Sequence, residues 1–245
     1  MKLVIVAGGL ATRMRPITEE IPKCLIDVNG KPLIEHQLEF FREHGFKDIV
    51  FCVAHLADKV KKHFGVGRDF GLCIEYVQET GALLGTAGSV KLAENLLDDD
   101  FIVHYGDNLT SMDFHKLIAY HKDKKSEATV VVRPLPPGYK SSSLVVLDEK
   151  NRIKAFKEKP TMDEMEKYSC EKKYINSGIY VLGREVLDRI PENTKYDFTK
   201  DLFPKLLEED FGFFGYPTEE YFREIGRVEK YEAFLKEVKG KKEIL

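Results

Sequence analysis

The sequence predicts an α/β domain with a mostly parallel, mixed sheet flanked by helices. Two observations predict this class. In the first half of the chain, short apolar runs rich in β-branched residues alternate with amphipathic segments, the pattern of successive strand–helix–strand units. In the second half this pattern gives way to a hairpin and isolated strands, which we expect to extend the same sheet. A chain of 245 residues can bury a full core without disulfide or metal cross-links.

The first half contains the clearest helix and strand signals. Residues 33–44 follow Pro32 and precede Gly45, and proline before the first turn with glycine after the last is typical of helix ends. The expected strands are residues 3–7, 49–53, 74–77, 101–105 and 128–132. The other expected helices are residues 57–64, 86–97 and 114–124.

The second half contains fewer helical segments. Apolar runs at 144–147 and 153–156 flank polar turn residues and predict a hairpin. A further strand is expected at 179–182, with helices at 199–208 and 228–238. We therefore expect one domain over residues 1–238, with halves of about 1–125 and 126–238, and a solvated tail over 239–245.

Composition excludes several classes of protein. Lys and Arg total 38 against 41 Asp and Glu, so the chain has no overall basic field of the kind that binds nucleic acid. No apolar run approaches the roughly 20 residues needed to cross a bilayer, and the N-terminus begins a strand rather than a signal peptide. The four cysteines show no zinc-ligand spacing. We expect a cytoplasmic protein that binds neither nucleic acid nor membranes.

A glycine-rich loop follows the first strand. In "VIVAGGLATRMRP", Gly8 and Gly9 leave backbone N–H groups open to a ligand, and Arg13 adds donors suited to phosphate oxygens. The loop lacks both GxGxxG and GK[ST], so a tight turn with surface arginines is an equally good interpretation of the glycines alone. Open α/β sheets bind ligands at the carboxyl ends of strands, where Asp107 also lies. We expect these two loops to be neighbours in space.

Several motifs together resemble a known family. "AGGLATRMRPITEEIPKCLIDVNGKPLIEH" closely resembles the opening signature of the sugar-1-phosphate nucleotidyltransferases. The resemblance continues, in the family's order, through "LGTAG", "YGDN", "FKEKP", "YINSGIY" and "FREIGRVEKYEAF" and so covers nearly the whole chain. It implies a Rossmann-like sheet of the nucleotide-diphospho-sugar transferase type, with a nucleotide-binding first half and a sugar-phosphate-binding second half.

The resemblance also implies the reaction. A sugar 1-phosphate oxygen would attack the α-phosphorus of an NTP, and pyrophosphate would leave, with Mg²⁺ bridging phosphates. By resemblance, Arg13 would neutralise the departing pyrophosphate, Lys23 would hold the α-phosphate, and Asp107 would bind the metal with Glu224. This chemistry depends on positioning and charge stabilisation, which explains why no nucleophile motif is present.

Other residues are assigned by matching the family's motifs. The nucleotide-binding set is Ala7, Gly8, Gly9, Gln78, Glu79, Gly85 and Thr86. The sugar-phosphate-binding set is Gly106, Asn108, Glu158, Lys159, Asn176 and Gly178. Considered alone, Asp107 would be an ordinary turn residue, Thr86 part of a helix N-terminus, and the pair at 158–159 a solvated charge pair.

The chain departs from the family pattern in three places. Ala11 replaces a glycine, which a non-positive φ would tolerate. "PPGYKSSSLVVLD" lacks the usual glycine before its valines. Glu224 stands where a second metal-binding aspartate is usual; it is expected to bind Mg²⁺, and the alternative is a salt bridge to a nearby lysine or arginine.

One residue bears on which nucleobase and which sugar phosphate the chain would use. Glu79 can accept hydrogen bonds from paired N–H groups of guanine that uracil and thymine lack, which favours guanylyl transfer to a mannose- or heptose-type phosphate. Alternatives are thymidylyl, uridylyl or cytidylyl transfer to another sugar or alcohol phosphate, and an inactive regulator that only binds nucleotide sugars. The oligomeric state is not determined by the sequence, and the resemblance allows a homo-oligomer.

Overall fold

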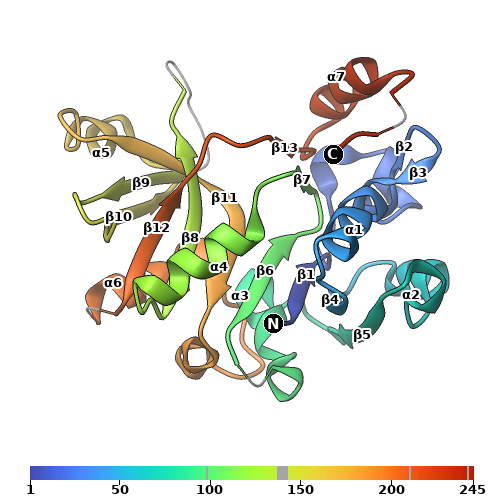
Figure 1. Ribbon diagram of the computed structural model, residues 1–245, viewed down its shortest axis with the longest axis horizontal. Helices are drawn as coiled ribbons and strands as arrows, with labels where there is room; N and C mark the ends of the chain where they lie inside the picture. Colours follow the sequence, from blue (N-terminus) through green and yellow to red (C-terminus); the bar gives the residue numbers. More distant parts are fainter. Residues whose placement is uncertain (98, 137–142, 210, 242) are drawn as a thin grey trace. The chain divides into compact units, whose positions relative to one another are not determined.

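The computed structural model describes residues 1–97, 99–136, 143–209, 211–241 and 243–245 (Figure 1). The chain forms two compact units, each described here by itself. The first unit comprises Met1–Leu83, His104–Met112 and Glu220–Leu245, and the second comprises Leu84–Val103 and Asp113–Glu219. The predicted single domain with halves that meet at about residue 125 stays a prediction, because these units combine segments from different parts of the chain. Most of "PPGYKSSS" lies outside the described residues.

The first unit is built on a parallel sheet. Strand β1 (Leu3–Val6) pairs with β4 (Asp48–Val53), which pairs with β5 (Cys73–Gln78), all in parallel. Leu3, Val4 and Ile5 are fully buried, as expected for a strand covered on both faces. The last two residues of β6 (Phe101–Tyr105) also belong to this unit. These strands lie where the sequence predicts them, and they confirm the parallel part of the predicted sheet.

Helices and two small sheets complete the first unit. The helices are α1 (Leu33–Glu43), α2 (Ala57–Phe64) and α7 (Val228–Val238), with short helical turns at Thr12–Met14, Ile17–Glu19, Lys23–Leu25 and Arg68–Phe70. Strand β2 (Asp27–Val28) pairs with β3 (Lys31–Pro32), and β7 (Asn108–Thr110) pairs with β13 (Phe222–Glu224). The tail differs from the prediction, because Ile244 and Leu245 pack, partly buried, against a core cluster that includes Phe234 and Val238.

The second unit has a mixed sheet. Strand β11 (Lys173–Leu182) runs antiparallel to both β8 (Ala128–Pro134) and β9 (Ser143–Leu147). Strand β10 (Ile153–Glu158) forms the predicted hairpin with β9, and β12 (Phe213–Pro217) runs parallel to β8. The sequence pattern did not predict β12, because Gly215 and Pro217 lower its strand signal. These strands are the extra strands expected in the second half.

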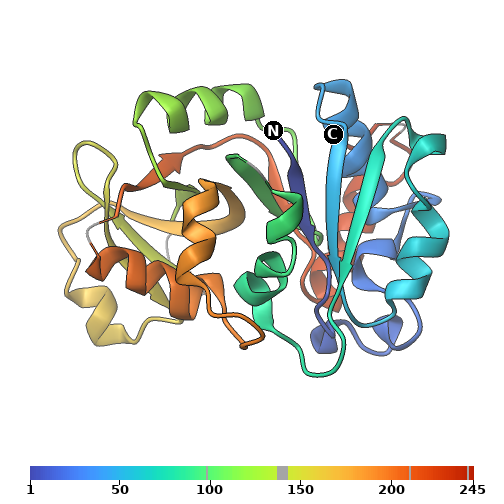
Figure 2. The ribbon, with the colours of Figure 1, turned by 90° about the horizontal axis from the view of Figure 1, so that it is seen from below.

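Helices lie on both sides of the second unit's sheet. Figure 2 shows α4 (Phe114–Asp123) on one side and α6 (Phe203–Glu208) on the other. The Tyr120 hydroxyl of α4 donates to the carbonyl of Gly215, 2.8 Å away. Phe203 of α6 packs its ring 5.0 Å from that of Tyr180 on β11. The remaining elements are α3 (Gly85–Lys91), α5 (Met162–Glu166) and helical turns at Glu94–Leu96, Arg184–Arg189 and Phe198–Leu202.

Two predicted helices are shorter than expected. The predicted 86–97 helix is interrupted after Lys91, and the 199–208 helix begins as a π-helical turn before α6. The two segments meet at their N-terminal ends, where the 194–198 segment forms hydrogen bonds with the first turn of α3. In the described part of the chain, no helix is long and apolar enough to cross a membrane.

Candidate functional site

The glycine loop begins where β1 ends. The Ala7 amide donates to the carbonyl of Cys52, 2.9 Å away, and so continues the strand pairing into the loop. A Cβ on Gly8 would lie 3.0 Å from Glu79 Oε1 and 3.2 Å from Ala54 Cβ, whereas a Cβ on Gly9 would meet nothing within 4 Å. Packing therefore explains Gly8. Gly9 faces open space, where a ligand can approach the backbone closely.

The loop continues through a strained alanine. Ala11 has φ 47° and ψ 38°, in the left-handed region. The expectation that a non-positive φ would make this alanine harmless is wrong. The Thr18 hydroxyl donates to the Ala11 carbonyl at 2.9 Å, and the helical turn at Thr12–Met14 starts immediately after it. These contacts hold the loop in a conformation that glycine would adopt more readily.

Arg13 is exposed at the end of this loop. Its Nη2 lies 3.7 Å from the position that a Cβ on Gly226 would occupy. Neither Arg13 nor its exposed neighbour Arg15 forms an ion pair with any residue that the structure describes. An arginine without an acidic partner can bind an anion without first breaking a salt bridge.

The loop after β6 lies against the glycine loop. The Gly106 amide donates to the carbonyl of Val6, 3.0 Å away. A Cβ on Gly106 would lie 3.3 Å from Ala7 Cβ and 3.3 Å from the Val6 carbonyl oxygen, so glycine permits this close approach. The expectation that the two loops are neighbours is confirmed within the first unit.

Lys23 and Asp107 form an ion pair beside these loops. Lys23 follows Pro22 in a helical turn, and its Nζ donates to Asp107 Oδ2. The two side chains retain only 15% and 21% exposure, so the pair is more shielded from water than a typical surface pair. The pair places a cation and a carboxylate together at the carboxyl end of the parallel strands.

His104 is a buried residue of β6, three positions before Asp107. Burial lowers its pKa to about 4, although the nearby Asp107 carboxylate opposes that shift. The imidazole is therefore neutral near pH 7 and adds no charge beside Asp107. Its ring packs edge-on against Phe41, with centroids 5.3 Å apart, which makes it a core residue of the first unit.

Strand β13 brings Glu224 next to Asp107. Glu224 lies opposite Asn108 in the antiparallel pair of β13 with β7, and the Ile225 amide donates to the Asp107 carbonyl at 2.9 Å. The Glu224 carboxylate itself pairs with Lys230 of α7. The salt bridge considered as the alternative for Glu224 is thus present in this structure.

The donor set in this region fits a cation that takes few protein ligands. No group of three or more His, Cys, Asp and Glu residues suited to a metal occurs in the described part of the chain. Mg²⁺ commonly uses one or two carboxylates together with substrate phosphates and water, which matches Asp107 and Glu224. In this structure each of these carboxylates pairs with a lysine ammonium, Asp107 with Lys23 and Glu224 with Lys230.

The expected base-reading residues lie at the end of β5. Glu79 Oε1 faces Gly8, as described above, and the Glu79 charge adds to burial in raising the pKa of Cys52. The neighbouring Gln78 accepts a hydrogen bond at its Oε1 from Lys61 Nζ, 2.6 Å away. The structure therefore brings Glu79 to the glycine loop and engages the Gln78 carbonyl elsewhere.

Gly85 and Thr86 belong to the second unit. A Cβ on Gly85 would lie 2.8 Å from the Tyr196 carbonyl oxygen, and φ at Gly85 is +73°, so the fold itself requires glycine. The Thr86 amide and hydroxyl both donate to Asp197 Oδ1, at 3.2 and 3.3 Å. The interpretation of this motif as a helix N-terminus is therefore confirmed, and its role in reading a base stays a prediction.

The sugar-phosphate set of the second unit gathers around Ser143. Ser143 lies opposite Glu158 in the β9–β10 pair, and its Oγ accepts from the Asn176 amide at 2.9 Å. The Asn176 side chain bonds to the Gly178 amide and the Tyr180 hydroxyl, at 3.0 and 2.9 Å, across a bulge where φ at Gly178 is +68°. The sequence did not single out Ser143, the last of three serines before the apolar run 144–147.

The carboxyl group of Glu158, at the end of β10, has a raised pKa. Burial raises its pKa, while Lys159, Lys200 and a hydrogen bond with Thr199 oppose the shift. Lys159 itself has a left-handed backbone, with φ 50°. Glu158 is thus less exposed to water than a member of an ordinary solvated pair, whereas Lys159 is exposed.

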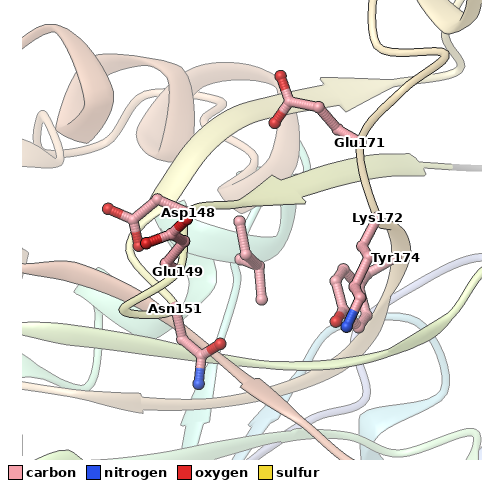
Figure 3. A pocket seen from close by; sticks show the side chains of 7 residues that line it. Asp148, Glu149, Asn151, Glu171, Lys172 and Tyr174 are labelled. Atoms are coloured by element: carbon pink, nitrogen blue, oxygen red, sulfur yellow. The ribbon is translucent and has the colours of Figure 1, made fainter.

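A shallow hollow elsewhere in the second unit lies apart from the predicted residues. It has a volume of about 280 Å³ and is lined by Leu147, Asp148, Glu149, Asn151, Glu171, Lys172 and Tyr174. Figure 3 shows Asp148 and Glu149 across the hollow from Lys172 and Tyr174. None of the predicted site residues lines it, so it does not define the candidate site.

A sequence model of the family described as "Nucleotidyl transferase" matches residues 2–240. The chain belongs to this family. It is 37% identical over 243 residues to UTP–glucose-1-phosphate uridylyltransferase of Synechocystis sp., covering 94% of this chain and 61% of that relative. It is 32% identical over 234 residues to mannose-1-phosphate guanylyltransferase of Mycobacterium tuberculosis, covering 93% of this chain and 62% of the relative. The chain thus spans about three fifths of the length of these curated relatives.

Solved structures agree with this membership. HddC from Yersinia pseudotuberculosis has a TM-score of 0.80 and 25% identity, covering 97% of this chain and 99% of that one. The same protein complexed with GMP-PN has a TM-score of 0.78 and 26% identity, with the same coverage. The predicted Rossmann-like fold class and the resemblance to sugar-1-phosphate nucleotidyltransferases are both confirmed.

Proposed function

We propose that this chain transfers a nucleoside monophosphate from an NTP to a sugar 1-phosphate. A phosphate oxygen of the sugar 1-phosphate forms a bond to the α-phosphorus, the bond from that phosphorus to the β-phosphate oxygen breaks, and pyrophosphate leaves. The observation that carries this proposal is the Lys23–Asp107 pair, held beside two adjoining loops at the end of β1 and β6. An in-line displacement needs such fixed charges more than it needs a protein nucleophile.

The first unit supports an orientation for the nucleotide. The Glu79 carboxylate beside Gly8 would repel phosphate, so the base is expected near Gly8 and the phosphates nearer the positive charges of Arg13 and Lys23. Glu79 can only accept hydrogen bonds, which favours a base with N–H groups on its edge. Gly9, with no neighbour to crowd it, leaves the backbone open between these regions.

We further propose Mg²⁺ as the cation, held by Asp107 and Glu224. When bound, it would offset negative charge on the phosphates. The second unit would hold the sugar phosphate through Glu158, Lys159 and Asn176. The hydrogen bonds that fix Asn176 support this assignment, since side chains that bind sugar hydroxyls need fixed orientations.

Guanylyl transfer to a mannose- or heptose-type phosphate is the preferred form of this activity. It is supported by Glu79, by the guanylyltransferase relative and by the neighbour complexed with GMP-PN. Uridylyl transfer is the main alternative within the family, because the uridylyltransferase relative has the higher identity. Thymidylyl and cytidylyl transfer, and an alcohol phosphate acceptor, are further alternatives that the same assay distinguishes.

The experiment is a pyrophosphate-release assay with GTP, UTP, dTTP, CTP and ATP, each combined with mannose, glucose and heptose 1-phosphates and with an alcohol phosphate. We expect the highest rate with GTP and a mannose- or heptose-type phosphate, and no rate after chelation of divalent cations. Release with no substrate pair, together with retained binding of nucleotide sugars, would instead support an inactive regulator. The Lys230–Glu224 pair is the observation that favours this second function.

A further inference from the structure

Lys230 holds a carboxylate that the proposed function assigns to the metal. Its Nζ donates to Glu224 Oε2 from the first turns of α7, and both side chains are partly exposed, at 46% and 35%. Glu224 in turn lies opposite Asn108, one residue from Asp107. The sequence offered a salt bridge to a nearby lysine or arginine as the alternative for Glu224, and the structure identifies Lys230 as the partner.

A divalent cation and an ammonium group compete for the same carboxylate. Two positive charges within contact distance of one carboxylate also repel each other, and a dication doubles that repulsion. Lys230 contacts Oε2, and Oε1 lies over Gly226. A cation at either oxygen is therefore repelled by the ammonium group as long as Lys230 stays paired with Glu224.

The local structure makes withdrawal of Lys230 feasible. Lysine has a long flexible stem, and an exposed ion pair of this kind contributes little to stability. A Cβ on Gly226 would lie 2.2 Å from Glu224 Oε1, so it is the glycine that lets the carboxylate turn back over the backbone to reach Lys230. The carboxylate can leave this position without disturbing the β7–β13 pairing.

We propose that Lys230 is the counterion of Glu224 in the cation-free protein, and that it competes with the divalent cation for this carboxylate. This inference rests on the proposed function for the role of Glu224. It makes Lys230 a positioning residue that sets the cation concentration at which the site fills. The family motif predicts an acidic side chain at position 224. The fold of this chain adds Lys230, whose ammonium group competes with the cation for that side chain.

The test measures cation binding directly. Free Mn²⁺ is followed by electron paramagnetic resonance during titration of the parent, Lys230→Met, Glu224→Gln and the double variant, without nucleotide. Methionine keeps most of the apolar stem and removes the charge. Removing one unit charge next to a partly exposed dication site should lower the Mn²⁺ dissociation constant about fivefold. Glu224→Gln should raise it, and Lys230→Met should give no gain in the Glu224→Gln background.

A matched control removes the same charge from the same helix. Lys236 is exposed on α7 and pairs with no acidic residue in the described part of the chain. Lys236→Met should leave Mn²⁺ binding unchanged, and Lys230→Arg should bind Mn²⁺ like the parent. An equal gain in Lys236→Met, no gain in Lys230→Met, or a gain that persists without the Glu224 carboxylate would overturn the inference.

The same variants separate this inference from the proposed function. Pyrophosphate release by the parent tests the reaction, and the Mn²⁺ titrations test the competition. A parent that releases no pyrophosphate but shows the Lys230→Met gain refutes the reaction and keeps the competition. An active parent whose Mn²⁺ affinity is the same in every variant keeps the reaction and refutes the role of Lys230.

Discussion

Replacing Arg13 with alanine tests the electrostatic part of the proposed mechanism. Arg13 has no ion pair among the described residues and is exposed, so its truncation should change the free energy of unfolding by no more than about 0.5 kcal/mol. Its proposed role is to stabilise the charge that develops on departing pyrophosphate. The change should therefore affect the rate and not the fold.

The size of the effect follows from the environment of the side chain. One unit charge 4 Å from another contributes about 1 kcal/mol in bulk water and about 4 kcal/mol near a protein surface. Bound substrates would shield the exposed guanidinium from water, which places the expected loss in the upper part of this range. Removing one preorganised donor typically lowers turnover by about 10²–10³-fold, which agrees with that estimate.

The assay compares Arg13→Ala with Arg15→Ala in pyrophosphate release and thermal unfolding. Arg15 is the matched control, because it is also exposed and unpaired within the described residues, two positions along the same segment. We expect unchanged melting temperatures in both variants and a large loss of turnover only in Arg13→Ala. Near-normal turnover in Arg13→Ala, or an equal loss in Arg15→Ala, would refute the reasoning.

Four further predictions concern single residues. Glu79→Gln should reduce turnover with GTP far more than with UTP or dTTP, by about 1.5–3 kcal/mol in kcat/KM, and an equal loss with all NTPs would remove Glu79 from the base site. Glu224→Ala should raise the Mg²⁺ concentration that gives half-maximal rate, whereas Glu224→Asp should retain partial activity; an unchanged requirement in Glu224→Ala would leave only the salt bridge. Ala11→Gly should stabilise the fold by about 0.5–1 kcal/mol in denaturant unfolding, since φ at Ala11 is 47°, and a loss of stability would contradict the strain. The lowered pKa of His104, about 4, means that the unfolded chain binds a proton more readily, so the free energy of unfolding should fall as pH drops from 6.5 towards 4. His104→Leu should make that fall shallower, and the same slope in both proteins would show that His104 does not cause it.

Local patterns were sufficient for most of the fold. The helix at Ala57–Phe64 and the strand at Phe101–Tyr105 have the bounds that their sequence patterns predict. Alternation of apolar and polar residues is a property of the segment itself, so it survives without knowledge of the neighbours. Strand β12 forms by pairing with β8, and the sequence indicated neither this strand nor the interruption after Lys91.

For the candidate site, too, some features follow from the sequence and others only from the tertiary structure. The sequence by itself determined the family and the residue types that the reaction needs, because Gly8, Arg13, Lys23 and Asp107 lie in long, ordered motifs. Tertiary structure decided that Gly8 is required by packing while Gly9 is open, that Ala11 is left-handed, and that Glu224 pairs with Lys230. Each of these depends on the direction of a side chain or a backbone angle, and contacts between segments far apart in the chain set both.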